Sequence, residues 1–438
     1  MTPQTPDTTP SAEVSDHDDE TDDVQPLTEP RDGVPLVIST SEGLQRAAAA
    51  LASGTGPAAL DAERASGFRY GQRAFLVQIR REGSGTWLID PEPFDDLKII
   101  DEALSGVEWI LHAASQDLPC LSELGMWPDK LFDTELAARL AGLPRVGLAA
   151  VIEKLLGLGL AKEHSAVDWS TRPLPEAWLG YAALDVEVLT ELRHELRSVL
   201  STDGKLTFAE EEFEAIRAAG VPEPRTDPWR RTSGMHQLRD RRQLEAVRRL
   251  WLERDRLASK RDVAPGRLIP DSAIVAAAKA MPATVPELLS TNGFHGRAAK
   301  REAPRWLRCI DGARRATTLP PLHLPSTAPP PPRVWADRDP EAAARLATAR
   351  DRLGTLAEEL HMPVENLLTP DTLRRLAWRP PTAITAGAVA ADLLERGARN
   401  WQVELVSAVI TEAFNHPDPL PVKGSNKQGS NAEPDRKE

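Results

Sequence analysis

Four acidic residues and a tyrosine, in three separate stretches of the chain, have the types and spacing that metal-dependent chemistry on phosphate esters needs. Asp61 and Glu63 end an apolar run typical of a strand, and residues i and i+2 of a strand point to the same face. Asp117 lies where a helix is expected to begin, and Tyr181 and Asp185 are one turn apart on a later helix. Each feature alone is ordinary, because acids favour sheet edges and the first turns of helices. Their combination suggests one shared site.

Hydrolysis of a phosphodiester needs an attack on an anionic phosphorus and an alkoxide leaving group. Two divalent ions about 3.5–4 Å apart can stabilise both oxygens. Carboxylate oxygens suit Mg²⁺ or Mn²⁺, and without metal such carboxylates would repel one another. The two cysteines, Cys120 and Cys309, lack the spacing of a zinc site or a disulfide framework, which favours a reducing cytoplasm.

The elements that must position these residues follow an α/β pattern over residues 34–205. Apolar runs predict strands, and helical periodicity predicts the helices between them. The expected strands are Ala58–Asp61, Phe75–Ile79, Trp87–Ile89 and Trp109–His112. The expected helices are Ser41–Leu51, Phe94–Leu104, Ser115–Gly125, Phe132–Ala141, Leu148–Leu156 and Pro175–Leu200.

Composition divides the rest of the 438 residues. Residues 1–33 carry ten acidic residues and one arginine, with almost nothing to bury, and are expected to form a disordered acidic tail. After a connector at 206–229, an arginine-rich helical module is expected at 230–313, then a Pro-rich linker at 314–340, a second helical module at 341–416 and a disordered tail at 417–438. No apolar run is long enough to cross a membrane, and no secretory leader is expected.

An internal repeat supports the two helical modules. The motif Leu268-Ile-Pro-Asp271 recurs as Leu368-Thr-Pro-Asp371, about a hundred residues later. Residues 225–315 carry 21 Lys and Arg against 10 Asp and Glu, a net charge of +11, although the whole chain has −13. Such a basic module beside an acidic domain favours contact with nucleic acid phosphates over a merely solvated helix face.

The motifs resemble those of the DEDDy 3′→5′ exonucleases, and of ribonuclease D in particular. The resemblance covers residues 35–200 and rests on the order of the acids, on His112-Ala-Ala-Ser-Gln-Asp117-Leu118, and on Asp168-Trp-Ser-Thr-Arg172-Pro173-Leu174 followed by Tyr181-Ala-Ala-Leu-Asp185. Residues 230–313 resemble an HRDC domain, and the second module resembles it more loosely. The resemblance implies an α/β ribonuclease H-like exonuclease domain followed by two all-α HRDC-like modules.

The resemblance also implies roles for the site residues. Asp61, Glu63, Asp117 and Asp185 would hold two Mg²⁺ or Mn²⁺ ions, with Asp61 bridging them. Tyr181 would orient the attacking water. The substrate contacts that it suggests are less specific, since core packing explains several of them equally well: Phe75, Gln78, His112, Trp169 and Arg172.

The implied activity is 3′→5′ hydrolysis of RNA, releasing nucleoside 5′-monophosphates, with tRNA precursors and other structured RNA as partners. A DNA 3′→5′ exonuclease is the first alternative, because the same carboxylates serve DNA in related families. An inactive nucleic-acid-binding protein is the second, and it requires a missing carboxylate, whereas all four are present. For the second module, docking to protein is as well supported as contact with RNA.

Overall fold

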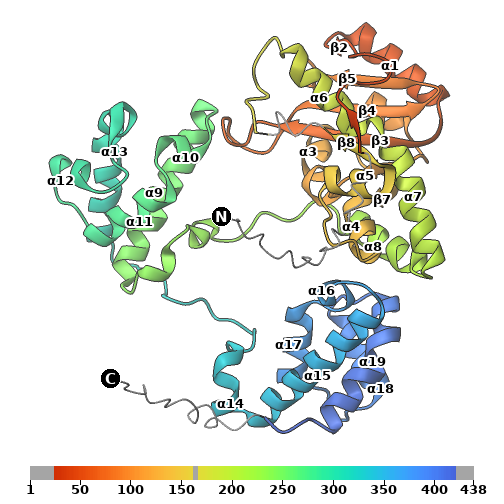
Figure 1. Cartoon of the computed structure of the whole chain (residues 1–438). Coiled ribbons are helices and arrows are strands. Elements are labelled where there is room, and N and C mark those ends of the chain that lie inside the picture. Colours follow the sequence, from red (N-terminus) through yellow and green to blue (C-terminus); the bar gives the residue numbers. More distant parts are fainter. Residues whose placement is uncertain (1–23, 161–165, 421–438) are drawn as a thin grey trace, which may run out of the picture.

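The chain forms an α/β domain and two helical modules, shown from red through green to blue in Figure 1. The structure is a computed structural model, and it describes residues 24–160 and 166–420. In those ranges no helix is both long and apolar enough to cross a membrane.

A six-stranded mixed sheet forms the centre of the α/β domain, in the order β2-β5-β4-β3-β6-β7. Its strands are β2 (Val37–Ile38), β3 (Thr55–Arg64), β4 (Ala74–Glu82), β5 (Gly85–Ile89), β6 (Glu108–Leu111) and β7 (Lys130–Asp133). β3, β4 and β5 pair as an antiparallel meander, while β6 and β7 extend the sheet in parallel from β3. The long strand β3 is therefore central, and its Ala58–Leu60 stretch is fully buried.

Helices cover this sheet and supply the other side of the site. They are α1 (Ser41–Ser53), α2 (Lys98–Ala103), α3 (Leu118–Glu123), α4 (Thr134–Leu140), α5 (Leu148–Leu156), α6 (Glu176–Glu187) and α7 (Leu189–Thr202). Two expectations were wrong in detail. Phe132 belongs to β7 rather than to a helix, and the long helix expected at Pro175–Leu200 divides at Val188, whose backbone (φ −115°, ψ 9°) is not helical.

The segment before the sheet is ordered from residue 24 onward, contrary to the expected disorder of residues 1–33; residues 1–23 lie outside the described range. β1 (Gln25–Leu27) pairs in parallel with β8 (Leu158–Leu160). Arg31 then bonds to Glu191 of α7 at 2.6 Å. A strand partner and an ion pair thus fix a stretch whose composition alone suggested a tail.

The expected connector at 206–229 is largely a helix, α8 (Leu206–Ala219), that packs on the α/β domain. Phe213 lies against Phe132, with ring centroids 4.8 Å apart. Phe208 on the same helix stacks on Trp401 of the second helical module, at 4.7 Å. α8 therefore joins the α/β domain and the second module through one continuous hydrophobic core.

The first helical module (228–315) has its own core, built around Trp229, Phe294 and Trp306. Its helices are α9 (Arg241–Arg261), α10 (Pro265–Leu268), α11 (Asp271–Ala280), α12 (Val285–Ser290) and α13 (Gly296–Arg315). The second helical module (332–415) repeats this succession of a long helix, a one-turn helix, two intermediate helices and a long helix. It contains α15 (Pro340–Glu359), α16 (Val364–Leu367), α17 (Pro370–Trp378), α18 (Ala386–Glu395) and α19 (Asn400–Asn415).

Part of the expected linker at 314–340 belongs to the second module. α13 continues to Arg315, and a one-turn helix, α14 (Trp335–Arg338), precedes α15. Trp335 is fully buried and lies 4.8 Å from Trp378, ring centroid to centroid. The buried Trp335 therefore belongs to the second module, and the linker ends before it rather than at residue 340 as expected.

Candidate active site

β3 carries the first two carboxylates into a cavity of about 870 Å³. Asp61 and Glu63 alternate with the buried Ala62, so the pleat of the strand turns both acids toward the cavity. Carboxylate oxygens of Asp61, Glu63 and Asp185 all lie within 4.8 Å of one another. Three acids from two elements thus face a single small volume.

Asp117 reaches the same cavity from the turn after β6. This turn contains a 3₁₀ helix, η1 (Ala114–Gln116), and starts at Ala113, whose φ of 61° is left-handed. The buried Asp133 fixes that backbone, because its carboxylate accepts from the amides of Ala113 (3.1 Å) and Ala114 (2.9 Å) and also caps α4. Asp133 is a supporting residue that sequence reasoning missed, since its role becomes visible only in three dimensions.

α6 supplies Tyr181 and Asp185 on one face, one turn apart. The hydroxyl of Tyr181 hydrogen-bonds to the carboxylate of Asp185. On the opposite face, Ala182 and Ala183 are fully buried, and such small side chains allow the helix to approach the sheet closely. The cavity is lined by all four acids and the tyrosine of the sequence pattern: Asp61, Glu63, Asp117, Tyr181 and Asp185.

Burial raises the pKa of each carboxyl group, and neighbouring carboxylates raise it further for Glu63, Asp117 and Asp185. Removal from water, the larger cause, raises the pKa of Asp61 to about 6 and that of Asp117 to about 8. The pKa values of Glu63 and Asp185 are held well above their usual range by the same burial and by neighbouring carboxylates. Such a cluster is stable in its charged form when a cation neutralises it, and its all-oxygen donors fit a hard divalent ion.

One arginine lies among these acids and was not singled out from the sequence. Arg64 directly follows Glu63, and its Nη2 lies 3.2 Å from Oδ1 of Asp117. Its Nη1 donates to the main-chain oxygen of Gln116 at 2.9 Å. The only signal in the sequence was a basic residue directly after Asp61-Ala-Glu63.

Two of the suggested substrate contacts lie beside the carboxylates. His112 lines the cavity, with Nδ1 2.9 Å from Oγ1 of Thr134, and burial lowers its pKa to about 4, so its ring is neutral near pH 7. Gln78 is fully buried on β4, and its Nε2 lies 3.5 Å from Oδ2 of Asp61. The buried Gln78 therefore supports Asp61 rather than facing the cavity.

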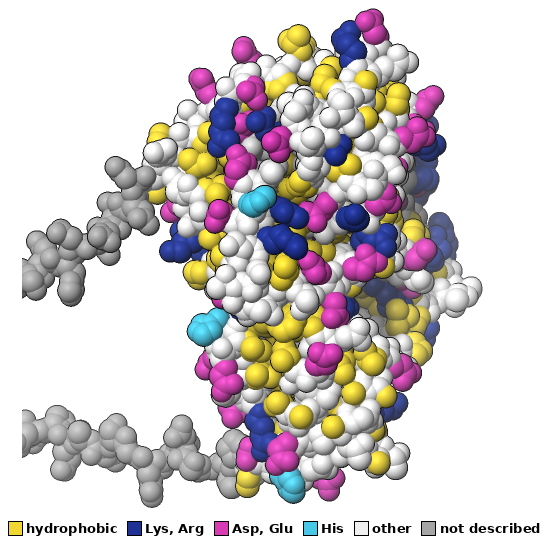
Figure 2. Space-filling model, turned by 90° about the vertical axis from the view of Figure 1, so that its right-hand side faces the viewer, with side chains coloured by type: hydrophobic (Ala, Val, Ile, Leu, Met, Phe, Trp, Pro, Cys, Tyr) yellow, Lys and Arg dark blue, Asp and Glu magenta, His cyan; other side chains and the backbone are white. Residues whose placement is uncertain are grey.

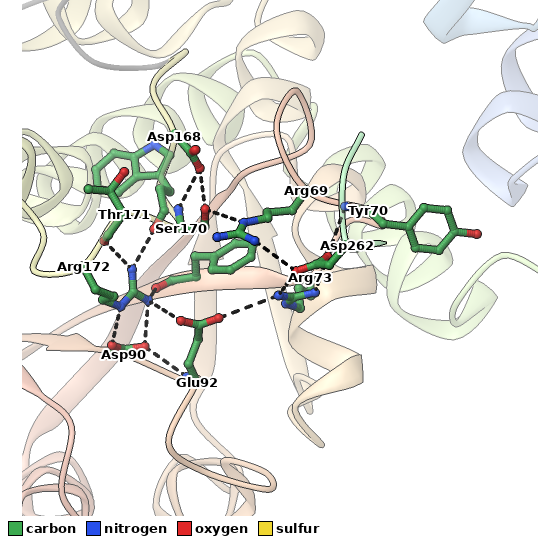
Figure 3. Close-up of polar contacts among 12 residues, drawn as sticks. Arg69, Tyr70, Arg73, Asp90, Glu92, Asp168, Ser170, Thr171, Arg172 and Asp262 are labelled. Atoms are coloured by element: carbon green, nitrogen blue, oxygen red, sulfur yellow. Dashed lines mark hydrogen bonds and ion pairs between the residues drawn. The ribbon is translucent and has the colours of Figure 1, made fainter. Parts of the chain in front are cut away.

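The other three suggested contacts, Phe75, Trp169 and Arg172, do not line the cavity. Phe75 and Trp169 are buried together in a small core beneath α6. Arg172 forms a two-pronged pair with Asp90, at 2.7 and 2.8 Å, and donates to the main-chain oxygen of Phe75 (Figure 3). In this structure they hold the segment that leads into α6, so packing accounts for them better than contact with substrate.

The same polar network reaches the first helical module (Figure 3). Arg69 donates to Ser170 at 2.7 Å and lies 3.5 Å from Asp262, the residue that ends α9. Arg73 binds both carboxylate oxygens of Asp262, at 3.1 and 3.0 Å. Asp262 thus connects the module to the segment before α6.

The mixed sheet, the acidic cavity and the Tyr-x-x-x-Asp helix define the class of a 3′→5′ exonuclease. A family model described as "3'-5' exonuclease" matches residues 35–201, the HRDC domain model matches 243–310, and a model described as "3' to 5' exonuclease C-terminal domain" matches 328–414. Ribonuclease D of Escherichia coli K12 is 32% identical over 61% of this chain and 71% of its own length. The chain belongs to the ribonuclease D family, and it is a 3′→5′ exoribonuclease.

Other relatives and solved structures agree. Ribonuclease D of Granulibacter bethesdensis is 30% identical over 64% of this chain and 71% of its own length, and that of a Shewanella strain is 33% identical over 53% and 61%. A crystal structure of a Bifidobacterium adolescentis protein has a TM-score of 0.82 at 41% identity, covering 90% of this chain and all of that one. Escherichia coli RNase D has a TM-score of 0.64 at 26% identity, covering 87% and 99%. The predicted family and fold class, an exonuclease domain followed by helical modules, are confirmed.

Proposed function

We propose that this enzyme removes nucleotides from the 3′ ends of structured RNA, such as tRNA precursors, with two bound Mg²⁺ or Mn²⁺ ions. The supporting observation is that carboxylate oxygens of Asp61, Glu63 and Asp185 lie within 4.8 Å of one another, in a cavity that also contains Asp117 and Tyr181. The relative from Escherichia coli is described as an exoribonuclease involved in structured RNA processing, which supports the same class of substrate here.

In this proposal the four carboxylates hold the metal and Tyr181 directs water. A carboxylate oxygen of Asp61 lies within 4.8 Å of those of Glu63 and Asp185, and Nε2 of Gln78 lies 3.5 Å from Oδ2 of Asp61. Bound divalent ions would lower the charge of the scissile phosphate and stabilise the attacking and leaving oxygens. Tyr181 stays protonated at neutral pH, because burial and the charge of Asp185 raise its pKa above the usual value. Its hydroxyl can therefore orient a water molecule without changing charge.

The first helical module supplies distant contacts to RNA in this proposal. A groove between α9 and α13, which we call the arginine groove, is lined by Arg248, Arg249, Leu252, Glu253, Arg256, Arg305, Arg308 and Cys309. Five arginines against one lining carboxylate suit a phosphate backbone. In contrast, the face in Figure 2 interleaves acidic and basic side chains without an extended basic patch.

Not every arginine of α9 is available to RNA. Arg242 donates to the main-chain oxygen of Ala313 at the end of α13, and Arg241 donates to that of Pro320. Arg248 and Arg249 both line the groove, but both bond to the buried Glu245. Arg256 and Arg308 are the exposed arginines of the groove, and the proposed grip depends mainly on them. Arg256 also pairs with Glu253 at 2.7 Å, and an exposed pair of this kind is weak enough for a phosphate to replace it.

A reducing cytoplasm remains part of the proposal. Among the described residues Cys120 and Cys309 are free thiols, and burial raises the pKa of both, to about 12 and about 11. Thiols with such a high pKa are poor nucleophiles at neutral pH.

The test compares a 3′-extended tRNA with a DNA strand of matched sequence, in Mg²⁺ and in excess EDTA. We expect 5′-monophosphates from RNA, faster hydrolysis of RNA than of DNA, and no hydrolysis in EDTA. Asp61→Asn and Asp185→Asn should each abolish hydrolysis while leaving the circular dichroism spectrum unchanged, since each replaces one carboxylate oxygen by an amide of similar size. Glu42→Gln, an exposed residue of α1, is the control. Hydrolysis that persists in EDTA would overturn the metal mechanism, and a preference for DNA would overturn the substrate.

A further inference from the structure

Arg64 lies where a cation would bind Asp117. Its guanidinium spans the carboxylate of Asp117 and the main-chain oxygen of Gln116, so it is held at the turn after β6. The carboxylate of Asp117 is buried, whereas a quarter of the Arg64 side chain (26%) is exposed.

No other described arginine or lysine forms an ion pair with the four carboxylates. Arg139 lines the same cavity but bonds to Glu135. The neighbouring His112 is uncharged near pH 7. Asp61, Glu63 and Asp185 form the described group that could hold a metal, and Asp117 is not a member of it. Among the described residues, Arg64 is therefore the basic side chain that pairs with Asp117.

Arg64 also borders a second cavity. This cavity, of about 370 Å³, shares Ala62, Glu63 and Arg64 with the main cavity and continues to Phe68 and Val167. Arg64 thus lies at the junction of the two cavities. A phosphate entering there would offer two oxygens to the guanidinium, which is the geometry that arginine binds best.

We propose that Arg64 is a positioning residue that covers Asp117 in the free enzyme and moves to a phosphate of the RNA when substrate binds. Asp117 then becomes available to a second divalent ion. This inference rests on the proposed function, because it requires metal at the carboxylates. It implies that RNA phosphate and the second ion strengthen each other's binding, by the same factor in both directions.

The direct test measures Mn²⁺ binding by electron paramagnetic resonance, with and without adenosine 5′-monophosphate as the phosphate probe. In the wild type, the probe should tighten the weaker Mn²⁺ site about tenfold, as expected when one charge-assisted contact changes partner. In Arg64→Gln that site should be tight without the probe, and the probe should change it less than about twofold. In hydrolysis, Arg64→Gln should raise KM for RNA about tenfold and change kcat less than about threefold at saturating Mn²⁺.

Two further variants sharpen the result. Arg64→Lys keeps the charge without the two-pronged fork and should give an intermediate response. Arg46→Gln removes an exposed arginine of α1 that lines neither cavity and pairs with Glu42, and it should behave as the wild type. An unchanged response to the probe in Arg64→Gln would overturn this inference and leave the proposed function standing. Mn²⁺ binding that is absent, or unaffected by Asp61→Asn, would overturn both.

Discussion

In the metal-free chain, the carboxyl groups of the acidic cavity keep their protons to a higher pH than ordinary carboxyl groups do. Because the pKa values of Asp61 and Asp117 are about 6 and about 8 when folded, against about 4 for an unfolded aspartate, the folded state binds more protons between those values. Stability must then fall as pH rises through this window, the reverse of the usual behaviour of a salt-bridged carboxylate.

We therefore expect the melting temperature of the EDTA-treated enzyme to be lower at pH 8.5 than at pH 5.5. Millimolar Mg²⁺ should raise it most at the higher pH, because the metal replaces protons on the same oxygens. Calorimetry with and without metal measures both effects. Asp117→Asn should reduce the pH dependence, and a melting temperature that rises steadily with pH in EDTA would contradict the prediction.

Tyr181 should affect turnover rather than binding. Its hydroxyl bonds to Asp185 inside the cavity, so Tyr181→Phe removes one polar atom with little loss of packing. If this hydroxyl orients the nucleophilic water, kcat should fall about a hundredfold while KM changes little. Steady-state kinetics on a short oligoribonucleotide decides the matter. A large rise in KM with unchanged kcat would instead show a tyrosine that binds substrate.

At the scale of elements, the sequence predicts what depends on local periodicity. The alternation of β3 shows that Asp61 and Glu63 share a face, and helical spacing pairs Tyr181 with Asp185. Contacts between distant segments leave no such pattern. The burial of Trp169 beneath α6 could not be read from its neighbours in sequence, nor could the ordering of residues 24–33 by β8.

The two helical modules contact the exonuclease domain through equivalent turns, those that follow α9 and α15, which we call the first and the second corner. In each repeat a residue with left-handed backbone follows the first long helix: Asp262 (φ 47°) after α9, and His361 (φ 48°) after α15. Asp262 binds Arg73, while the main-chain oxygen of His361 accepts from the buried Lys205 at 3.2 Å. The side chain of Asp262 makes the contact at the first corner, whereas the main-chain oxygen of His361 makes the contact at the second. The same backbone motif therefore binds two different partners.

Breaking the first corner should loosen the first module without unfolding it. Arg73 and Asp262 are both well exposed, so their pair is worth on the order of 0.5–1 kcal/mol. A double-mutant cycle with Arg73→Ala and Asp262→Ala should report a coupling of that size in urea unfolding, and the double variant should be cut faster by protease near residues 221–228. Arg46→Ala and Glu42→Ala, a pair on the surface of α1, provide the matched cycle. Equal coupling in both cycles, with no change in proteolysis, would show that the corner does not hold the module.

For the whole molecule, charge is separated between an acidic catalytic domain and a basic helical module. If the arginine groove grips RNA, Arg256→Glu with Arg308→Glu should weaken tRNA binding about tenfold or more and make its salt dependence shallower, since fewer counterions are released. Hydrolysis of a dinucleotide should be unchanged, because so short a substrate does not reach the groove.

The control for that variant lies in the second module, where Arg350→Glu with Arg379→Glu makes the same change of charge at exposed positions. Equal loss of affinity in both double variants would indicate a diffuse electrostatic effect rather than a defined groove. Unchanged affinity and salt dependence in the groove variant would favour protein docking by the first module.

The shared core of the exonuclease domain and the second module has a consequence for synthesis of the chain. Phe208 and its stacking partner Trp401 are almost two hundred residues apart, and the whole first module is made between them. At ordinary translation rates the exonuclease domain waits roughly 10–40 s on the ribosome before α19 arrives to cover α8. During that interval the apolar face of α8 is open to chaperones and to premature association. The order of the modules along the chain therefore determines how long the catalytic domain remains incompletely covered.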